Sequence, residues 1–381
     1  MHVSVDNRCA NATSFRAAYV KSLFNAEDGS RFTLEADLPI DDPDWSIGVV
    51  VGPSGSGKSS IGHALWGGEA FYEPSWSSDR PIIDEIAPDA DTAAVTAALG
   101  SVGLGDVPAW LRPYSVLSNG ERFRADLARI VSEAPARVVV DEFTSVVDRQ
   151  IARVGAQAFA KSWRRNRGCQ AVLLTCHYDI LDWVAADWEF DTQSREFTRG
   201  CQRRRPPIEV EIREGGWGLW PLFKPHHYLD SGPMPAARCY VAFVDGEPVA
   251  HLGMGTKNVT TKQGATVEAR ACRMVVMPEW QGAGIGMRFL NHLCQRNLEG
   301  VGRIEGERMT TLFHTSHPVL CQALRRDPCW RQVSGVLHGE RAVRNGAPRR
   351  YAGMVSASFG GHFRAVSGFR YVGPPKREAT Q

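Results

Sequence analysis

The sequence predicts an α/β protein with two domains, and three observations lead to this fold class. The chain has 381 residues, enough for two domains with a sizeable core each. A strand, a glycine loop and a helix follow one another at residues 47–65, and the same order returns at residues 270–298. Between them lies a charged, proline-stopped stretch at residues 201–207, which we predict to be a linker. We therefore expect domains at residues 1–200 and 208–381.

Composition narrows the class of protein. No run of 18 apolar residues occurs, and the first residues lack the basic start and apolar stretch of a signal peptide. We therefore expect a cytoplasmic protein without a membrane partner. The nine cysteines form no C-x-x-C pair, which favours scattered buried thiols over disulfides or a zinc site.

The charge is unevenly distributed along the chain. Residues 322–381 hold eleven Lys or Arg and three acids, a net charge of +8, whereas the whole chain has +2. A basic end of this kind suits a polyanionic partner such as nucleic acid, or the phosphates of a cofactor. A solvated basic surface is the alternative interpretation.

The glycine loop at residues 52–59 predicts a nucleotide site. It matches G-x-x-x-x-G-K-[ST] between a strand-like run and a helix-like segment, the context in which this motif binds phosphate. Backbone N–H groups of such a loop converge on one anion, and the helix N-terminus adds its positive end. We expect Lys58 at the β- and γ-phosphates and Ser59 at Mg²⁺. The residues predicted to bind ATP here are Gly52, Ser54, Gly55, Gly57, Lys58, Ser59 and Ser60.

Upstream of the loop we expect two short strands, at residues 19–24 and 31–36. Phe24 lies 34 residues before Lys58 and is a candidate to stack on the adenine ring, with core packing as the alternative. Downstream we expect helices at residues 92–99 and from residue 119 onward.

Two buried-strand runs end in residues suited to the same site. Residues 138–140 lead into Asp141 and Glu142, and residues 171–174 lead to His177. Because ligands bind at the carboxyl ends of parallel strands, these side chains should face the phosphates. Asp141 would complete the Mg²⁺ shell, and Glu142 would orient or deprotonate the attacking water.

Five elements together resemble the ABC-type ATPase family over residues 10–200. They are a Walker A loop, the LSNGE segment at 117–121, a Walker B strand with its glutamate, a D-loop at 145–148 and a switch histidine. The resemblance implies ATP hydrolysis with Mg²⁺. It also implies an ATP-dependent homodimer, in which the signature of one chain completes the ATP site of the other. It adds Ser118, Gly120 and Asp148 to the ATP-binding residues.

The chain departs from this family at three points. Only 57 residues separate Walker A from the signature, and no glutamine occurs between Ser59 and Arg149 to form a Q-loop. Both points argue against a transporter subunit. Asn119 stands where glycine is usual in the signature, which leaves the rate of hydrolysis open.

The second half predicts a hairpin, at residues 237–244 and 248–255, and then a second anion loop. The strand 270–277 leads into a glycine turn and a helix at residues 287–298, without a lysine or an Mg²⁺-binding hydroxyl. Such a loop suits a pyrophosphate that needs no metal. We expect further strands at residues 208–212, 309–313 and 367–372 and a helix start at 315–318.

This region resembles motif A of the GNAT acyltransferase family in the frame VVMPEWQGAGIGMRFL. The resemblance implies an α+β domain with a mixed, mainly antiparallel sheet. It also implies acetyl-CoA or another acyl-CoA as donor and direct attack by an amine. The residues it assigns to acyl-CoA are Val275, Val276, Gln281, Gly282, Ala283, Gly284, Ile285 and Gly286.

The acceptor side is less defined. His226 and His227 lie where this family builds its acceptor pocket, and they could serve as base, substrate contact or metal ligand, or as capping or core histidines. Tyr371 and Tyr351 are candidates for the catalytic acid, with core packing as the alternative. The His-His-Tyr-Leu stretch resembles, more weakly, the Mom proteins that modify adenine in phage DNA, which leaves the donor open.

Both halves together resemble an ABC-type ATPase fused to an acetyltransferase domain. The leading hypothesis is an ATP-dependent acyltransferase that modifies nucleic acid. The alternatives are an ATP-switched binding module with a degenerate acyltransferase domain, and a transporter ATPase with an accessory domain.

Overall fold

A computed structural model gives the fold, and it describes residues 1–8, 14–24, 31–42, 44–200, 207–227, 232–234, 236–261, 264–338 and 364–375. The chain forms two compact units. The first comprises residues 1–87 and 113–206, and the second comprises residues 88–112 and 207–381. The change of unit at residue 207 falls at the end of the predicted linker. Residues 88–112, expected in the first domain, pack with the second unit instead.

A five-stranded sheet forms the centre of the first unit, in the order β4-β5-β3-β6-β7. All neighbours run parallel except β6 and β7, which run antiparallel. Strands β3 and β5 are buried, as expected of a parallel sheet covered on both faces. The bounds are β3 Ile47–Val51, β4 Arg137–Val140, β5 Gln170–Thr175, β6 Trp188–Asp191 and β7 Glu196–Arg199.

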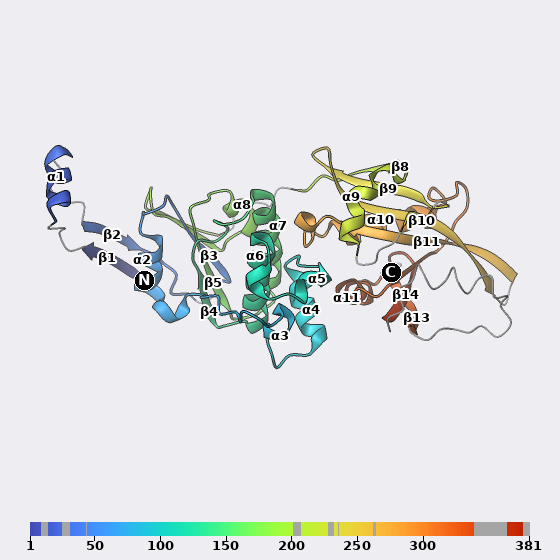
Figure 1. The fold of residues 1–381 in the computed structure, drawn as a ribbon, viewed down its shortest axis with the longest axis horizontal. Coiled ribbons are helices and arrows are strands. Elements are labelled where there is room, and N and C mark those ends of the chain that lie inside the picture. Colours follow the sequence, from blue (N-terminus) through green and yellow to red (C-terminus); the bar gives the residue numbers. More distant parts are fainter. Residues whose placement is uncertain are drawn as a thin grey trace, which may run out of the picture. The chain divides into compact units, whose positions relative to one another are not determined.

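Helices α2, α7 and α8 each follow a strand of this sheet along the chain (Figure 1). Helix α6 has a full capping box at its start and packs beside α7, which begins after the side-chain cap of Asp148. The helices are α1 Phe15–Phe24, α2 Lys58–Trp66, η1 Gly68–Ala70, α3 Ile82–Glu85, η2 Tyr114–Val116, α6 Asn119–Glu133, α7 Arg149–Trp163 and α8 Ile180–Val184.

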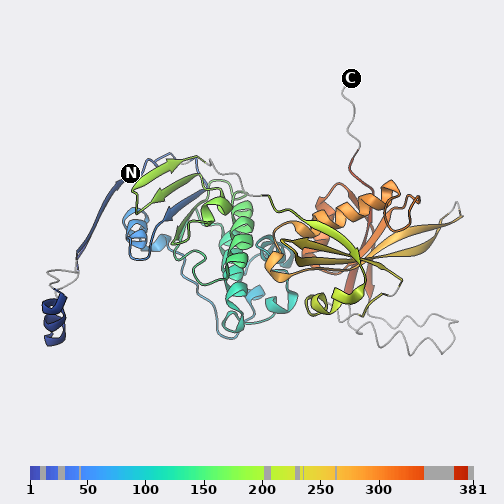
Figure 2. The ribbon, with the colours of Figure 1, turned by 90° about the horizontal axis from the view of Figure 1, so that it is seen from above.

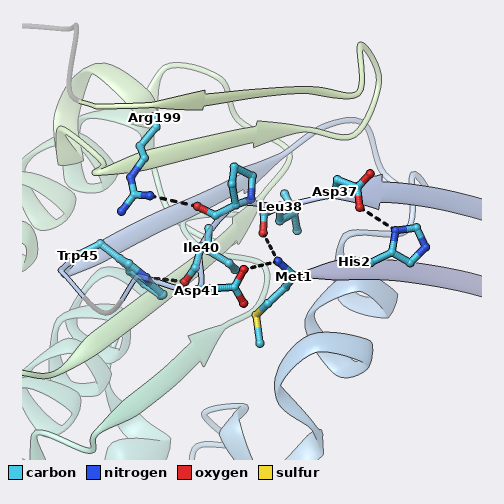
Figure 3. Close-up of polar contacts among 9 residues, drawn as sticks. Met1, His2, Asp37, Leu38, Ile40, Asp41, Trp45 and Arg199 are labelled. Carbon is cyan, nitrogen blue, oxygen red and sulfur yellow. Dashed lines mark hydrogen bonds and ion pairs between the residues drawn. The ribbon is translucent and has the colours of Figure 1, made fainter.

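A two-stranded ribbon, β1 His2–Arg8 with β2 Arg31–Asp37, precedes the sheet. Its buried side chains, among them Val3 and Leu34, join the core that holds Ile61 of α2 and Trp188 of β6. Figure 3 shows how polar contacts hold the end of the ribbon. The amino group of Met1 donates to the Leu38 carbonyl at 2.6 Å, and Arg199 of β7 donates to the Pro39 carbonyl at 3.2 Å (Figure 3).

The second unit is built on a seven-stranded sheet in the order β13-β14-β12-β11-β10-β9-β8. Only β11 and β12 run parallel, so the sheet is mixed and mainly antiparallel as predicted. The bounds are β8 Glu211–Gly215, β9 Arg238–Val244, β10 Glu247–Thr261, β11 Gly264–Val276, β12 Thr311–Thr315, β13 Trp330–His338 and β14 Arg364–Tyr371.

Helix α10 packs on the middle of this sheet, beside the long strands β10 and β11 (Figure 2). Its apolar positions, among them Phe289 and Leu293, are buried. The helices of the unit are α4 Thr92–Ser101, α5 Val107–Trp110, η3 Trp217–Leu219, α9 Trp220–Phe223, η4 Lys224–His226, η5 Pro278–Trp280, α10 Ile285–Glu299 and α11 Pro318–Arg326.

One predicted element has the wrong type. Residues 19–24 were expected as a strand but lie in helix α1, which begins after Ser14, whose hydroxyl accepts from the backbone N–H of Ala17 at 3.2 Å. This cap outweighs the β-branched and aromatic residues of the segment. The strand expected at 208–212 begins later, at Glu211, and β1, β6, β7 and β13 were not predicted.

Candidate functional site

The strand register of the first unit brings the predicted ATP-site residues to one edge. Val51 pairs with Thr175, and Val140 pairs with Leu173, two residues earlier on β5. The three strands therefore end at nearly the same level. Gly52 follows β3, Asp141 follows β4, and the segment that leads to His177 follows β5. All three therefore lie at the carboxyl edge of the sheet, where α/β sheets bind ligands.

The glycine loop has the backbone conformation that a phosphate cradle requires. Gly55 and Gly57 have φ of 78° and 88°, and Gly57 is the N-cap of α2 without any side-chain cap. A Cβ at Gly55 would meet nothing within 4 Å, so the loop is open at this point. Lys58 is buried and its Nζ donates to the carbonyls of Gly52 and Pro53 at 2.9 and 2.8 Å. This lysine is thus held across the loop where an anion would bind.

The remaining loop hydroxyls have different surroundings. Ser59 lies in the first turn of α2, directly after Lys58, while Ser60 accepts a hydrogen bond from Asn7 Nδ2 of β1 at 2.8 Å. Ser54 is exposed. Ser59 and Asp141 stay the pair predicted to hold Mg²⁺, and the structure adds Asn7 as a neighbour of the loop that the motif does not reveal.

Glu142 follows Asp141 with a positive φ of 50°, an unusual conformation for a residue other than glycine. Its backbone N–H donates to Asp141 Oδ1 at 2.8 Å, and its side chain is exposed. Strained backbone of this kind concentrates at functional sites. The predicted role of Glu142 in orienting water stays a prediction, for a carboxylate that is exposed directly after Asp141.

A hydrogen-bonded chain joins the Walker B turn to the switch histidine. Thr175 Oγ1 donates to the Phe143 carbonyl at 3.0 Å and accepts from the His177 backbone N–H at 3.1 Å. Beyond it, Arg149 of α7 forms a two-pronged ion pair with Asp179. The positions of Glu142 and His177 are therefore linked through Thr175.

The signature segment forms the start of α6. Ser118 is its N-cap, and the backbone N–H of Ser118 in turn donates to Glu121 at 2.8 Å. A Cβ at Gly120 would come within 2.8 Å of Ile151 Cδ1, so glycine allows α6 to approach α7. Asp148 caps α7 by accepting from Gln150 at 2.8 Å. Ser118 and Asp148 are both exposed.

A half-buried carboxylate that the sequence did not reveal fixes this helix. Asp126 of α6 accepts from Tyr72 Oη at 3.1 Å, Trp76 Nε1 at 2.8 Å and Tyr114 Oη at 2.7 Å. Burial raises the pKa of Asp126, against the opposing effects of these three donors and of Arg129. Asp126 therefore ties the stretch after Walker A, and the turn before the signature, to the signature helix.

In the second unit the two parallel strands separate beside the glycine turn. β11 pairs with β12 only at residues 269–271, although β11 continues to Val276. From Cys272 onward β11 is bonded only to β10. The segment that contains Val275 and Val276 therefore presents a backbone edge free of β12, where an extended ligand can add hydrogen bonds.

The glycine turn provides the anion cradle at the end of this edge. Gly282 and Gly284 have φ of 94° and 80° and are exposed, and Gly284 is the N-cap of the 15-residue helix α10 without a side-chain cap. A Cβ at Gly284 would meet nothing within 4 Å, so the helix N-terminus is open. Gly286 and Ile285 lie in its first turn, with Ile285 buried. The residues fit a diphosphate bound by backbone N–H groups.

The predicted acceptor-side residues are scattered. His226 is exposed at the end of η4, and His227 is half-buried with its ring 5.7 Å from that of Trp220. Tyr371 is buried and its hydroxyl donates to Gln295 at 3.2 Å, while burial raises the pKa of Tyr371. Its surroundings favour the core-packing alternative. Tyr351 and the side chain of Phe24 lie outside the described residues.

A histidine that the sequence did not reveal lies at the start of the separated segment. His251 of β10 is 0% exposed, and its Nδ1 donates to the carbonyl of Arg273 at 3.1 Å. Its ring contacts those of Trp217, Trp220 and Phe223, with centroids 5.0 to 5.5 Å away. Arg273 has φ of 52° at the β-bulge between β10 and β11. The side chain therefore lies where the backbone of β11 is distorted.

The other nitrogen of His251 has no partner in the part of the chain that the structure describes, and the same holds for the indole nitrogens of Trp217 and Trp220. Burial lowers the pKa of His251, so its neutral form is favoured, with Nε2 carrying a lone pair. A buried polar atom without a partner costs about 1–3 kcal/mol, which makes this cluster a candidate for binding or proton transfer.

The described residues show neither a metal cluster nor a membrane span. They contain no group of three or more His, Cys, Asp or Glu side chains that could hold a metal ion. None of the described helices is long and apolar enough to cross a membrane. All seven cysteines within the described ranges are free thiols.

Comparison with protein families gives a match in the second half of the chain. Residues 235–322 match the family described as an acetyltransferase (GNAT) domain. This stretch includes β9, β10, β11, α10 and β12, together with the whole glycine turn. The chain therefore contains a GNAT domain, as its motif predicted.

The ATPase resemblance has a counterpart among curated proteins. Over 169 residues the chain is 31% identical to "Methionine import ATP-binding protein MetN 1" of Rhodococcus jostii (strain RHA1). The match covers 44% of this chain and 44% of that protein, so the chain spans less than half the length of this relative.

Solved structures show more distant likenesses. The dimeric structure of MJ0796, a bacterial ABC transporter cassette, is 14% identical with a TM-score of 0.36, over 50% of this chain and 94% of that chain. CbiO1 from Clostridium perfringens, part of the transporter complex cbiONQ, is 15% identical with a TM-score of 0.32, over 44% of this chain and 80% of that chain. At these TM-scores we base no argument on either structure.

The chain thus joins an N-terminal region similar to an import ATP-binding protein to a stretch that matches a GNAT domain.

Proposed function

We propose that this protein hydrolyses ATP in its first unit and transfers an acyl group from acyl-CoA to an amine in its second, with nucleic acid as the acceptor. The observation that carries the proposal is the open helix N-terminus at Gly284, which lies directly after the β11 segment that leaves β12. A loop for a diphosphate and an edge for an extended chain are then consecutive, as one elongated acyl-CoA requires.

In the first unit different residues have different roles in ATP hydrolysis. The loop at 52–59 holds the phosphates, and Lys58 exchanges its two carbonyl partners for phosphate oxygens. Ser59 and Asp141 are the candidates to hold Mg²⁺, and Glu142 orients the attacking water. His177 is held near this water because its backbone is bonded to Thr175.

In the second unit the acceptor is a neutral amino group of a nucleic-acid base, and its nitrogen must lose one proton as it is acylated. His251 Nε2 is the candidate to receive that proton, because its ring is neutral and its other nitrogen is fixed by the Arg273 carbonyl. The amine nitrogen then forms a C–N bond with the acyl carbon while the C–S bond breaks. The released thiolate takes this proton back from His251, so the products are an amide and the free CoA thiol, with His251 neutral again.

Nucleic acid as the acceptor rests on charge. Arg325 and Arg326 end α11 and Arg331 lies on β13; all three are exposed, and none forms an ion pair with a carboxylate among the described residues. They belong to the segment with net charge +8. If they contact phosphates, the affinity for nucleic acid should fall steeply with salt.

The homodimer is proposed from the exposed signature. Val116 before the signature and Val146 in the D-loop are 63% and 70% exposed, large apolar side chains next to Ser118 and Asp148. Apolar residues beside polar ligand-binding groups suit a face that a second copy covers when ATP is bound. Sedimentation of Glu142→Gln with ATP should show a dimer, whereas nucleotide-free protein should show a monomer.

One experiment tests the whole proposal. ATP hydrolysis and release of CoA thiol are measured in the same samples, for the purified protein and Glu142→Gln, with no polymer and with single- or double-stranded DNA or RNA. Stimulated hydrolysis together with thiol release and an acylated product by mass spectrometry supports it. ATP-dependent polymer binding without thiol release would instead favour an ATP-switched binding module.

A further inference from the structure

Residues 88–112 belong to the second unit, although in the sequence they lie between two parts of the first unit. The segment lies in the chain after the P-loop helix and ends five residues before Leu117 of the signature, yet it packs within the second unit. Its two helices, α4 and α5, are joined by the glycine-containing turn 102–106. Both ends of the segment continue directly into the first unit, at Ala87 and at Pro113.

Helix α4 and the turn are seated on α11. A Cβ at Gly100 would lie 2.3 Å from Val319 Cγ1, so the two helices approach as closely as glycine allows. Gln322 Nε2 donates to the Ala93 carbonyl at 2.8 Å, and His317 Nε2 donates to the Gly105 carbonyl at 2.9 Å. Burial lowers the pKa of His317, which keeps this contact a hydrogen bond between neutral groups.

The turn also holds the first residue of the acyl-CoA loop. The backbone N–H of Gly105 donates to Gln281 Oε1 at 2.9 Å, and Gln281 Nε2 donates to the Val276 carbonyl at 3.1 Å. One side chain therefore bridges the turn and the end of β11. Gly103 has φ of 87°, and a Cβ there would lie 2.0 Å from the Gln281 carbonyl oxygen. Glycine at this position is thus required both by the backbone conformation and by the contact.

The position of Gln281 gives these contacts a consequence for ligand binding. Gln281 immediately precedes Gly282, whose positive φ starts the cradle, and Val276 ends the strand edge beside it. Holding Gln281 from both sides fixes the direction in which the loop leaves β11. Residues that act through the loop in this way are positioning residues, and for Gln281 this role is added to the one that its motif predicts.

We infer that Gly103, Gly105 and Gln281 position the acyl-CoA loop, and that residues 88–112 thereby link acyl-CoA binding to the nucleotide state of the first unit. The inference rests on the proposed function of the two loops. When nucleotide rearranges the signature region, the ends of the segment at Ala87 and Pro113 move with it, and the Gly105–Gln281 contact passes the change to the cradle. By thermodynamic reciprocity, acyl-CoA must change nucleotide affinity by the same factor.

The test measures this factor in the full-length protein. Acetyl-CoA affinity is determined by calorimetry without nucleotide and with saturating AMP-PNP and Mg²⁺, and AMP-PNP affinity is determined with and without acetyl-CoA. We expect both ratios to be equal and to lie within about 5- to 150-fold, the usual range for coupled sites. Gly103→Ala should weaken acetyl-CoA binding about tenfold or more and bring both ratios close to one.

The chain offers a matched control for the backbone strain. Gly246, in the β9–β10 turn of the same unit, has φ of 82°, and a Cβ there would meet nothing within 4 Å. Gly246→Ala therefore adds a similar conformational strain without a clash, and both ratios should stay at the wild-type value. If Gly103→Ala does not fold, Gln281→Ala removes the bridging side chain without adding an atom, and it should lower the ratios in the same way.

The outcomes separate this inference from the proposed function. Binding of both ligands with a ratio of one in the wild-type protein overturns the linkage while leaving the two sites in place. Equal effects of Gly103→Ala and Gly246→Ala overturn the positioning role. Absence of acetyl-CoA binding in the wild-type protein overturns the proposed function, and the inference falls with it.

Discussion

The half-buried carboxylate of Asp126 provides the sharpest test of how the signature helix is held. Asp126→Ala leaves three donors without a partner: the hydroxyls of Tyr72 and Tyr114 and the indole N–H of Trp76. At about 1–3 kcal/mol for each donor, and near the lower end because water reaches a partly buried site, the cost is about 3–4 kcal/mol.

Asp126→Asn should cost much less. The amide oxygen keeps the bonds from Tyr72 and Trp76, which both reach the same carboxylate oxygen, and the amide nitrogen faces the Tyr114 hydroxyl, which can accept. We therefore expect a loss of about 1 kcal/mol or less. The two variants remove the same charge, so their difference isolates the hydrogen bonds.

The sign of the pH dependence follows from the raised pKa of Asp126. The folded state holds this proton to a higher pH than the unfolded chain, whose carboxyl has the ordinary value of 3.8. The stabilisation is therefore complete below this value and is lost as the pH rises through the folded-state pKa. The advantage of the wild-type protein over Asp126→Asn should shrink as the pH is raised above the ordinary carboxyl value.

Hydrogen exchange of residues 119–133 under increasing urea measures this in the first unit alone, because it reports the opening of α6 and not the unfolding of the other unit. The reasoning is refuted if Asp126→Ala opens α6 no more easily than Asp126→Asn does. A wild-type advantage that grows toward neutral pH would show that the ionised carboxylate, and not its protonated form, is favoured in the fold.

Three further predictions concern the two sites. Lys58→Ala should lower ATP affinity about 10- to 100-fold, the effect of one charge-assisted bond of about 1.5–3 kcal/mol, and a fluorescent ATP analogue measures it. Gly284→Ala should weaken acetyl-CoA binding about tenfold through the cost of about 1–2 kcal/mol for φ of 80° in a residue with a Cβ, measured by calorimetry. Because burial lowers the pKa of His251 from 6.5, wild-type CoA release should persist into mildly acidic solution and then decline, whereas His251→Gln should be slow at every pH; a profile that His251→Gln leaves unchanged rules out proton transfer by this residue.

The sequence was sufficient to predict the type of an element where a motif and the spacing of apolar residues indicated the same structure. The P-loop, the signature helix, the Walker B strand and the hairpin with its glycine turn all have the predicted type. The failure at residues 19–24 has a local cause, because the Ser14 cap lies outside the apolar pattern on which the strand was based. Strand β13 was not predicted because it pairs with a distant strand, β14.

The candidate site was predicted less completely than the fold. His251 occurs in the run Pro248 to Gly253, where alternation places it inward like any core residue. Its free nitrogen and its bond to the bulge at Arg273 depend on a partner strand, so no local pattern contains them. Asp126 is similar, since its three donors come from Tyr72, Trp76 and Tyr114.

The membership of residues 88–112 shows the same limit at the level of domains. A contiguous stretch between two ATPase motifs was assigned to the ATPase domain, because chain order is the only guide that a single sequence offers. Two close approaches decide the packing of this segment, that of Gly100 to Val319 and that of Gly103 to Gln281. The two residues of the second pair are more than 170 positions apart in the sequence. A glycine in the sequence indicates that a close approach is possible, and only the fold shows what approaches.

The two anion loops of the chain share one backbone conformation, although the ligands proposed for them carry different charges. Gly57 and Gly284 are both N-caps with φ of 88° and 80°, and neither helix has a side-chain cap, so both helix starts leave their N–H groups free. The next residue differs: Lys58 beside the hydroxyl of Ser59 in one loop, and buried Ile285 beside Gly286 in the other. A triphosphate with Mg²⁺ needs the cation and the hydroxyl, whereas the diphosphate of acyl-CoA carries less charge and can be held by backbone N–H groups alone.

Ile285→Lys should therefore bury an uncompensated charge in the core under α10 and lower stability without creating ATP binding, because the loop lacks both the hydroxyl and a facing carboxylate for the metal. Tighter ATP binding by the second unit in this variant would show that the lysine, and not the whole set of ligands, separates the two sites.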